Sequence, residues 1–167
     1  MLIYRTVLSD NTLQAIDQEQ QNLTLQPQWQ SSALHWQNVL LEGIDGECLS
    51  TEVSSNLKEL ILNDIAKLLP PTSNLMIQHY LWMRNSGIAW HEDSHKKFGA
   101  TIYLNKEWHV NWGGIFLYAV ENRSPQDELK AVFPAHNTMI VNDLQEYHAV
   151  TPVNVKVVRT TLQIWGT

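Results

Sequence analysis

Apolar and polar residues follow a helical period in the first part of the chain. Between Ser50 and Leu69, apolar residues recur every three or four positions, and two prolines follow directly. This spacing predicts an amphipathic helix that the prolines terminate. Residues 2–8 read as a short strand. Residues 12–30, which are rich in glutamine, read as a helix and a loop with Asp10 as the cap.

From residue 75 onward the pattern changes to short runs of β-branched and aromatic residues, separated by glycine, proline and asparagine. These runs predict strands at residues 75–83, 88–91, 99–104, 114–120, 131–133, 138–142, 147–151 and 157–165. Eight short strands with no helix between them are typical of a β-sandwich or a small barrel. No repeat, linker or change of composition marks a second domain. We therefore expect one domain over residues 1–167, with residues 1–73 as a supporting region and residues 74–167 as the β core.

The composition is that of a globular protein, with 44% hydrophobic and 17% charged residues in 167 positions. No apolar run approaches the roughly 18 residues that a membrane span requires, and no secretory signal is visible at the start, so we expect a cytoplasmic protein without membrane contact. The single cysteine, Cys48, excludes an internal disulfide and a cysteine-rich metal site. Any metal chemistry must therefore rest on histidines and carboxylates.

The charge balance bears on the class of partner. The formal net charge is −6, and the 11 lysines and arginines are scattered along the chain. Proteins that bind nucleic acids gather such residues into basic patches. A nucleic acid is therefore an unlikely partner.

Three residues have the spacing of a metal site. His91 and Asp93 are two positions apart at the end of a predicted strand, so both side chains project from the same face. His148 lies 55 residues downstream in another predicted strand. Two histidines and one carboxylate on one face of Fe(II) leave three positions open for a bidentate co-substrate and O₂. Arg159 follows eleven residues later, and its guanidinium suits the far carboxylate of a small dicarboxylic acid.

Five segments carry a resemblance to a known family. They are Ile88–Asp93, Thr101–Trp108, Gly113–Leu117, Tyr147–Pro152 and Arg159–Trp165. Together they resemble the 2-oxoglutarate-dependent Fe(II) oxygenases, and specifically the prolyl-hydroxylase-like branch that includes the oxygen-sensing hydroxylases of hypoxia-inducible factor. The resemblance covers about residues 75–167.

The resemblance implies a mainly β fold, a double-stranded β-helix (jelly-roll) barrel with supporting N-terminal helices. It also implies that His91, Asp93 and His148 are the catalytic iron ligands. Arg159 would bind the C5 carboxylate of 2-oxoglutarate, and Tyr103 would donate a hydrogen bond to the same carboxylate. In the strand that follows the arginine, Gln163 stands where relatives often carry threonine or serine.

The implied reaction is a hydroxylation that consumes O₂ and 2-oxoglutarate and releases succinate and CO₂. A carboxylate at position 93 favours hydroxylation, because halogenating relatives have a small residue there. The expected substrate is a peptidyl proline or a free amino acid, hence a small molecule or a peptide. Candidate substrate residues are Trp90, which directly precedes the ligand His91, and Arg84. Further candidates for the mouth of the site are Trp82, His95 and His136.

Two other classes of function fit part of the pattern. His91-Glu92-x-x-His95 also matches the zinc-metallopeptidase motif, in which two histidines one helical turn apart bind zinc and the glutamate acts as the base. That motif requires a helix, whereas Gly87 and Gly99 bracket this segment and strand-like runs flank it. The third class is a non-catalytic jelly-roll module that binds a metal or a small acid.

Overall fold

A computed structural model describes residues 1–23, 29–31, 36–93, 95–119, 128–143 and 146–167. Two α-helices lie in the first half of the chain, α1 (Asp10–Leu23) and α2 (Ser55–Ile65), and the 3₁₀-helix η3 (Ala66–Leu68) extends the second. Short 3₁₀-helices η2 (Asn38–Leu41) and η4 (Val110–Trp112) occur in connecting segments. No helix in the described part of the chain is long and apolar enough to cross a membrane.

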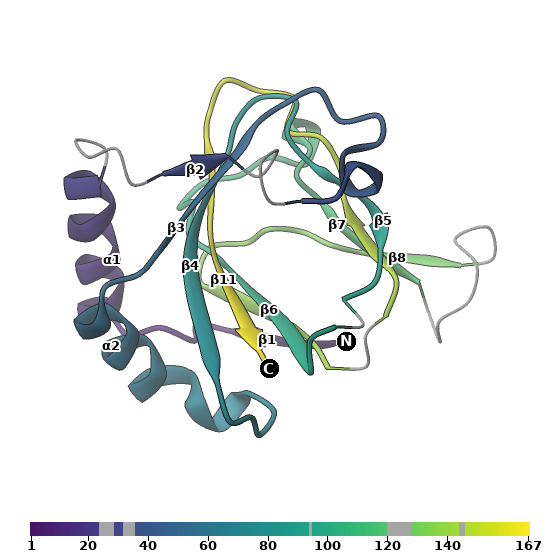
Figure 1. The fold of residues 1–167 in the computed structure, drawn as a ribbon. Helices are drawn as coiled ribbons and strands as arrows, with labels where there is room; N and C mark the ends of the chain where they lie inside the picture. Colours follow the sequence, from purple (N-terminus) through teal and green to yellow (C-terminus); the bar gives the residue numbers. More distant parts are fainter. Residues whose placement is uncertain (24–28, 32–35, 94, 120–127, 144–145) are drawn as a thin grey trace.

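Eleven strands in the described residues form two antiparallel sheets (Figure 1). The larger sheet has the order β1-β9-β6-β11-β4-β3-β2. Its strands are β1 (Leu2–Arg5), β9 (Thr138–Asn142), β6 (Phe98–Tyr103), β11 (Arg159–Gly166), β4 (Leu75–Trp82), β3 (Cys48–Glu52) and β2 (Gln30–Ser31). The smaller sheet has the order β5-β10-β7-β8. Its strands are β5 (Ile88–His91), β10 (His148–Val150), β7 (Phe116–Ala119) and β8 (Leu129–Val132).

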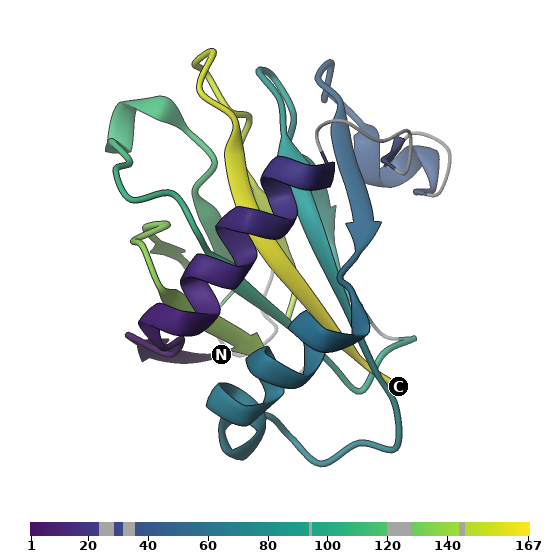
Figure 2. The same ribbon diagram turned by 90° about the vertical axis from the view of Figure 1, so that its left-hand side faces the viewer.

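Alternation along the central strands gives the larger sheet two different faces. On β11, Leu162 and Ile164 point to one side, toward the buried face of the helices, where Ile16 and Ile61 complete an apolar core. Both helices cover this face (Figure 2). The intervening residues of β11, Arg159 among them, point to the other side. There a second core joins side chains of both sheets, so the sheets pack face to face.

A polar link attaches α1 to α2 and to β4. His79 on β4 is fully buried, and its Nε2 lies 3.0 Å from Glu19 Oε1 on α1. The same Glu19 oxygen accepts the backbone N–H of Ser54 at 3.0 Å, and the Ser54 hydroxyl also donates to Glu19. Ser54 is the N-cap of α2, because its hydroxyl accepts the N–H of Leu57. One carboxylate therefore fixes the position of both helices on the sheet.

The strand predictions hold throughout the second half of the chain. Each of the eight predicted runs contains an observed strand, with ends displaced by about two residues at most. In the first half two predictions were wrong. The helix predicted from Ser50 begins at Ser55, because residues 48–52 pair with β4 as strand β3. The cap of α1 is Ser9 rather than Asp10, since the Thr12 N–H donates to the Ser9 hydroxyl. Part of the predicted 12–30 segment, residues 24–28, lies outside the described residues.

Candidate metal and co-substrate site

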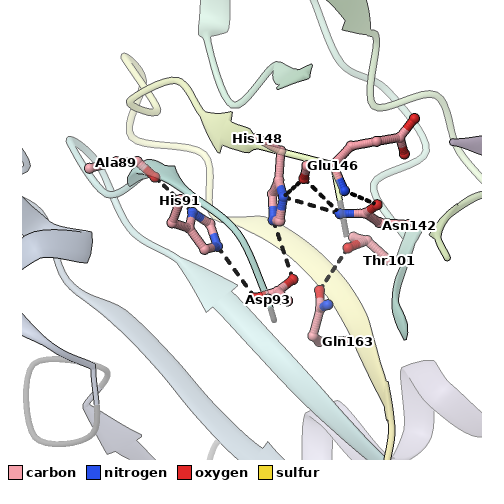
Figure 3. Close-up of polar contacts among 8 residues, drawn as sticks. All are labelled: Ala89, His91, Asp93, Thr101, Asn142, Glu146, His148 and Gln163. Atoms are coloured by element: carbon pink, nitrogen blue, oxygen red, sulfur yellow. Dashed lines mark hydrogen bonds and ion pairs between the residues drawn. The ribbon is translucent and has the colours of Figure 1, made fainter. Parts of the chain in front are cut away.

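The three predicted ligands converge from different segments of the chain (Figure 3). His91 ends β5, His148 begins β10, and these strands are paired so that the two residues are partners. Asp93 follows β5 and lies between them. Its Oδ1 is 3.6 Å from His91 Nε2, and its Oδ2 is 3.5 Å from His148 Nε2. One ligand atom from each residue lies within 4.8 Å of the others. This set has room for one ion with open positions opposite the protein ligands.

Backbone carbonyl groups fix the tautomer of both histidines. His91 Nδ1 lies 2.8 Å from the oxygen of Ala89, and His148 Nδ1 lies 2.9 Å from the oxygen of Glu146. A carbonyl oxygen only accepts, so each Nδ1 carries the proton and each Nε2 presents a lone pair. Both lone pairs face Asp93, and the site is ready for a cation without any change of tautomer.

Asn142, at the end of β9, holds the carbonyl group that orients His148. Its Oδ1 accepts the N–H of Glu146 at 2.9 Å, and its Nδ2 donates to the Glu146 oxygen at 3.0 Å. These two bonds settle the orientation of the amide. Asn142 is 4% exposed, and no sequence motif indicated it. The only signal in the sequence is that a polar residue directly follows the apolar run 139–141 in a predicted strand.

The environment keeps His148 neutral. Burial and, to a smaller extent, the neighbouring His91 lower its pKa, Asp93 opposes the shift, and the net pKa is about 4. At neutral pH the imidazole is therefore unprotonated at Nε2, as a metal ligand must be.

The ligands open into a cavity of about 560 Å³ between the two sheets. This volume is typical of a small-molecule site. Residues of β4, β6 and β11 form its floor, and Trp36 and Leu40 from the N-terminal region lie on its wall. Arg159 lines the same cavity. Its guanidinium carbon lies 5.0 Å from the ring centre of Trp82 and 5.2 Å from that of Tyr103.

Arg159 and Tyr103 carry buried polar atoms that the described residues leave without a hydrogen-bond partner. Both side chains are 1% exposed, and in the described residues Arg159 Nε and Nη1 and the Tyr103 hydroxyl have no hydrogen-bond partner. Burial raises the pKa of Tyr103 to about 12, so the hydroxyl keeps its proton. A buried cation without an acceptor is costly. A carboxylate placed here would satisfy all three groups, which is the fit expected of 2-oxoglutarate.

Gly114 makes room for Arg159. Its φ is +63°, and a Cβ at this position would lie 2.6 Å from Arg159 Cδ. Glycine is required here both by the backbone conformation and by the close approach of the arginine. The sequence singled out this glycine as part of the family resemblance, but the physical reason lies in this contact.

The other predicted residues are dispersed. Trp82 is 5% exposed and packs on Arg159, so it belongs to the cavity wall beside Arg159 and not to the mouth. Trp90 is half-buried and stacks on Tyr147 with 6.4 Å between ring centres. Arg84 is exposed in the turn between β4 and β5. Neither Trp90 nor Arg84 lines the cavity.

The two remaining histidine candidates also separate. His95 is exposed at the cavity edge, outside the group of three possible metal ligands. His136 lines a different hollow, beside α1, and its Nδ1 donates to the Leu104 oxygen at 3.0 Å.

Comparison with known proteins agrees with this site. The sequence model of the 2OG-Fe(II) oxygenase superfamily matches residues 65–166, and the chain belongs to this superfamily. It is therefore a 2-oxoglutarate-dependent Fe(II) dioxygenase, an oxidoreductase, and its cofactors are Fe(II) and 2-oxoglutarate. A search of curated proteins gives no match.

Solved structures share the fold at low sequence identity. A prolyl-4-hydroxylase from Pseudomonas putida superposes with a TM-score of 0.69 at 13% identity, over 99% of this chain and 91% of that one. A prolyl hydroxylase from Trichoplax adhaerens, in complex with a hypoxia-inducible factor peptide fragment, gives 0.69 at 14% identity over 99% and 82%. HygX from Streptomyces hygroscopicus, with nickel and 2-oxoglutarate bound, gives 0.66 at 13% identity over 99% and 81%.

The zinc-peptidase alternative finds no support. Its motif needs His91 and His95 on one helix, whereas His91 is the last residue of strand β5 and neither Glu92 nor Asp93 is helical. The family match also opposes it, and it opposes a non-catalytic module as well.

Proposed function

We propose that His91, Asp93 and His148 are the iron ligands of this dioxygenase, and that Arg159 and Tyr103 bind the C5 carboxylate of 2-oxoglutarate. The observation that carries the proposal is the shared cavity. At one end it holds three convergent ligand atoms, and at the other a buried guanidinium whose Nε and Nη1 have no hydrogen-bond partner among the described residues. Iron and 2-oxoglutarate together supply the activation of O₂ that ends in hydroxylation.

The roles of the residues follow from their surroundings. The carbonyl oxygens of Ala89 and Glu146 hold the two imidazoles in the ligand tautomer. Arg159 anchors the co-substrate, and the aromatic rings around it exclude water, which strengthens the ion pair. The Tyr103 hydroxyl donates to the same carboxylate.

The proposed substrate is a peptidyl proline or a free amino acid, which is hydroxylated with release of succinate and CO₂. The support is the fold shared with prolyl hydroxylases of two organisms, one of them in complex with a peptide. Trp90 and Arg84 lie outside the cavity and are proposed to contact a substrate that extends beyond it. Succinate release with a panel of proline-containing peptides and free amino acids tests the substrate class, and release with neither would refute it.

The architecture proposed for the chain is a double-stranded β-helix (jelly-roll) barrel. It is supported by the two facing antiparallel sheets and by the oxygenases with the same fold. We propose that residues 1–167 form one domain, in which residues 1–73 support the core of residues 74–167 with helices α1 and α2 and with strands β1 to β3. The cytoplasmic location and the absence of a nucleic-acid partner stay predictions.

Metal and co-substrate binding can be tested directly. Protein prepared without oxygen is mixed with Fe(II) and then with 2-oxoglutarate, and the visible charge-transfer band of the chelated iron is recorded. We expect the band in the wild type and in His95→Ala, and its loss in His148→Ala. The matched pair compares two cavity histidines, of which only His148 points at Asp93. A band that survives His148→Ala but not His95→Ala would refute the ligand assignment.

A further inference from the structure

The floor of the cavity carries a polar residue between Arg159 and the metal ligands. On β11, Arg159, Thr161, Gln163 and Trp165 alternate with the residues that face the helices, and three of these four line the cavity. Gln163 lies four residues from Arg159, about 13 Å along the strand. Thr161 lies between them, and its hydroxyl accepts the indole N–H of Trp82 at 3.1 Å.

Gln163 on β11 lies next to β6, the strand that Asp93 covers. On β6, Gly99 lies under Asp93, since a Cβ built on it would be 3.3 Å from Asp93 Oδ2. Thr101 follows on the same face of β6 and pairs in register with Gln163. Figure 3 shows Gln163 beside Asp93, with Thr101 above it. A molecule that reaches from Arg159 to the metal ligands must therefore pass over Gln163.

A neighbouring hydroxyl orients the Gln163 amide. The Thr101 hydroxyl donates to Gln163 Oε1 at 2.7 Å. This bond occupies the acceptor end of the amide and leaves the Nε2 hydrogens as the free donors. Gln163 is half-buried and lines the cavity. In the described residues Nε2 has no hydrogen-bond partner, so its hydrogens are available to a molecule in the cavity.

From these contacts we infer that Gln163 is a co-substrate-binding residue, which donates from Nε2 to the C1 carboxylate of 2-oxoglutarate, at the end remote from Arg159. The inference rests on the proposed function. A neutral donor suits this place, because the charges of iron, Asp93, Arg159 and the dianion already balance. A second cation would leave an excess charge in a buried site. An amide adds the hydrogen bond and leaves the balance unchanged.

Two ligands and two substitutions test whether Gln163 binds the C1 carboxylate, the distal carboxylate or neither. The ligands are 2-oxoglutarate and 2-oxopentanoate, a 2-oxo acid that keeps the C1 end but lacks the distal carboxylate. The substitutions are Gln163→Glu, which exchanges the donor for a negative charge in an isosteric side chain, and Gln163→Met, which removes the donor without a charge. Gln78→Glu is the matched control, because Gln78 pairs with Gln163 on β4, lines the same cavity and lies one strand farther from the ligands.

Dissociation constants are read from the charge-transfer band of the anaerobic Fe(II) protein, so no turnover is needed. We expect Gln163→Glu to raise the dissociation constants of both ligands by about tenfold to a hundredfold, and Gln163→Met to raise them by about tenfold. These changes correspond to the loss of one hydrogen bond to a charged group. Gln78→Glu should raise the dissociation constants much less.

If the variants lost affinity for 2-oxoglutarate but not for 2-oxopentanoate, the inference would be overturned, because Gln163 would then bind the distal carboxylate. Unchanged constants for both ligands would also overturn it and would make Gln163 a substrate-facing residue. If the wild type itself gives no band, the proposed function has failed instead. Gln163→Met decides the matter if Gln163→Glu does not fold.

Discussion

A single methyl group at Gly114 tests whether Arg159 is the anchor of the co-substrate. The Cβ of Gly114→Ala would lie 2.6 Å from Arg159 Cδ and 3.1 Å from its Nε. Arg159 is 1% exposed and packs on the rings of Trp82 and Tyr103, so a displaced side chain loses this packing. Either the Arg159 side chain or the backbone of residues 113–114 must shift. In the first case the position at which the guanidinium can bind a carboxylate shifts as well.

The expected magnitude has two parts. Alanine at a φ of +63° costs about 1–2 kcal/mol of folding free energy, because its Cβ meets the following carbonyl group. A displaced guanidinium loses hydrogen bonds to a carboxylate worth about 1.5–3 kcal/mol. At 1.4 kcal/mol for each factor of ten, this loss raises the dissociation constant of 2-oxoglutarate by roughly tenfold to a hundredfold.

Gly43→Ala provides the control for backbone strain. Gly43 has a φ of +71°, but a Cβ there meets nothing within 4 Å. Urea unfolding should show that both variants lose about 1–2 kcal/mol from strain, with a further loss in Gly114→Ala. Titration of the anaerobic Fe(II) protein with 2-oxoglutarate should show weaker binding in Gly114→Ala alone. Equal dissociation constants in the two variants would refute the role given to the Gly114–Arg159 contact.

Three further predictions concern other parts of the structure. Asn142→Ala should leave His148 free to rotate and weaken Fe(II) binding by about tenfold or more; a metal titration that matches the wild type would contradict this. Burial lowers the pKa of His79 in the folded protein. As the pH falls, His79 therefore becomes protonated in the unfolded chain before it does so in the folded protein, and the unfolding free energy should decrease below about pH 6.5. Urea unfolding at pH 7 and pH 5 should show a smaller decrease in His79→Gln, and an equal decrease would exclude His79 as the cause. Trp90→Ala should retain iron and fold but raise the substrate KM, because Trp90 stacks at the surface on Tyr147; loss of folded protein would contradict a surface role.

The β core was predictable from local pattern, whereas the N-terminal region was less so. The short runs of β-branched and aromatic residues in 75–166, separated by glycine, proline and asparagine, match the observed strands, and this pattern requires no knowledge of partners. Residues 50–52 read as the start of a helix because their own pattern is ambiguous, whereas they belong to strand β3. These residues form a strand because they pair with β4, where Ser50 lies opposite Tyr80.

The sequence by itself determined the chemistry of the site, because residue types and a spacing of two along a strand are local properties. His91, Asp93, His148 and Arg159 were predicted from residue type and position along the chain, and Tyr103 from the resemblance. The tertiary structure decided which side chains support them. Asn142 contacts Glu146 and His148 only because β9 and β10 lie close together, and Thr101 contacts Gln163 only through the register of β6 with β11. Register and turns arise from packing of the whole domain, so no local pattern contains them.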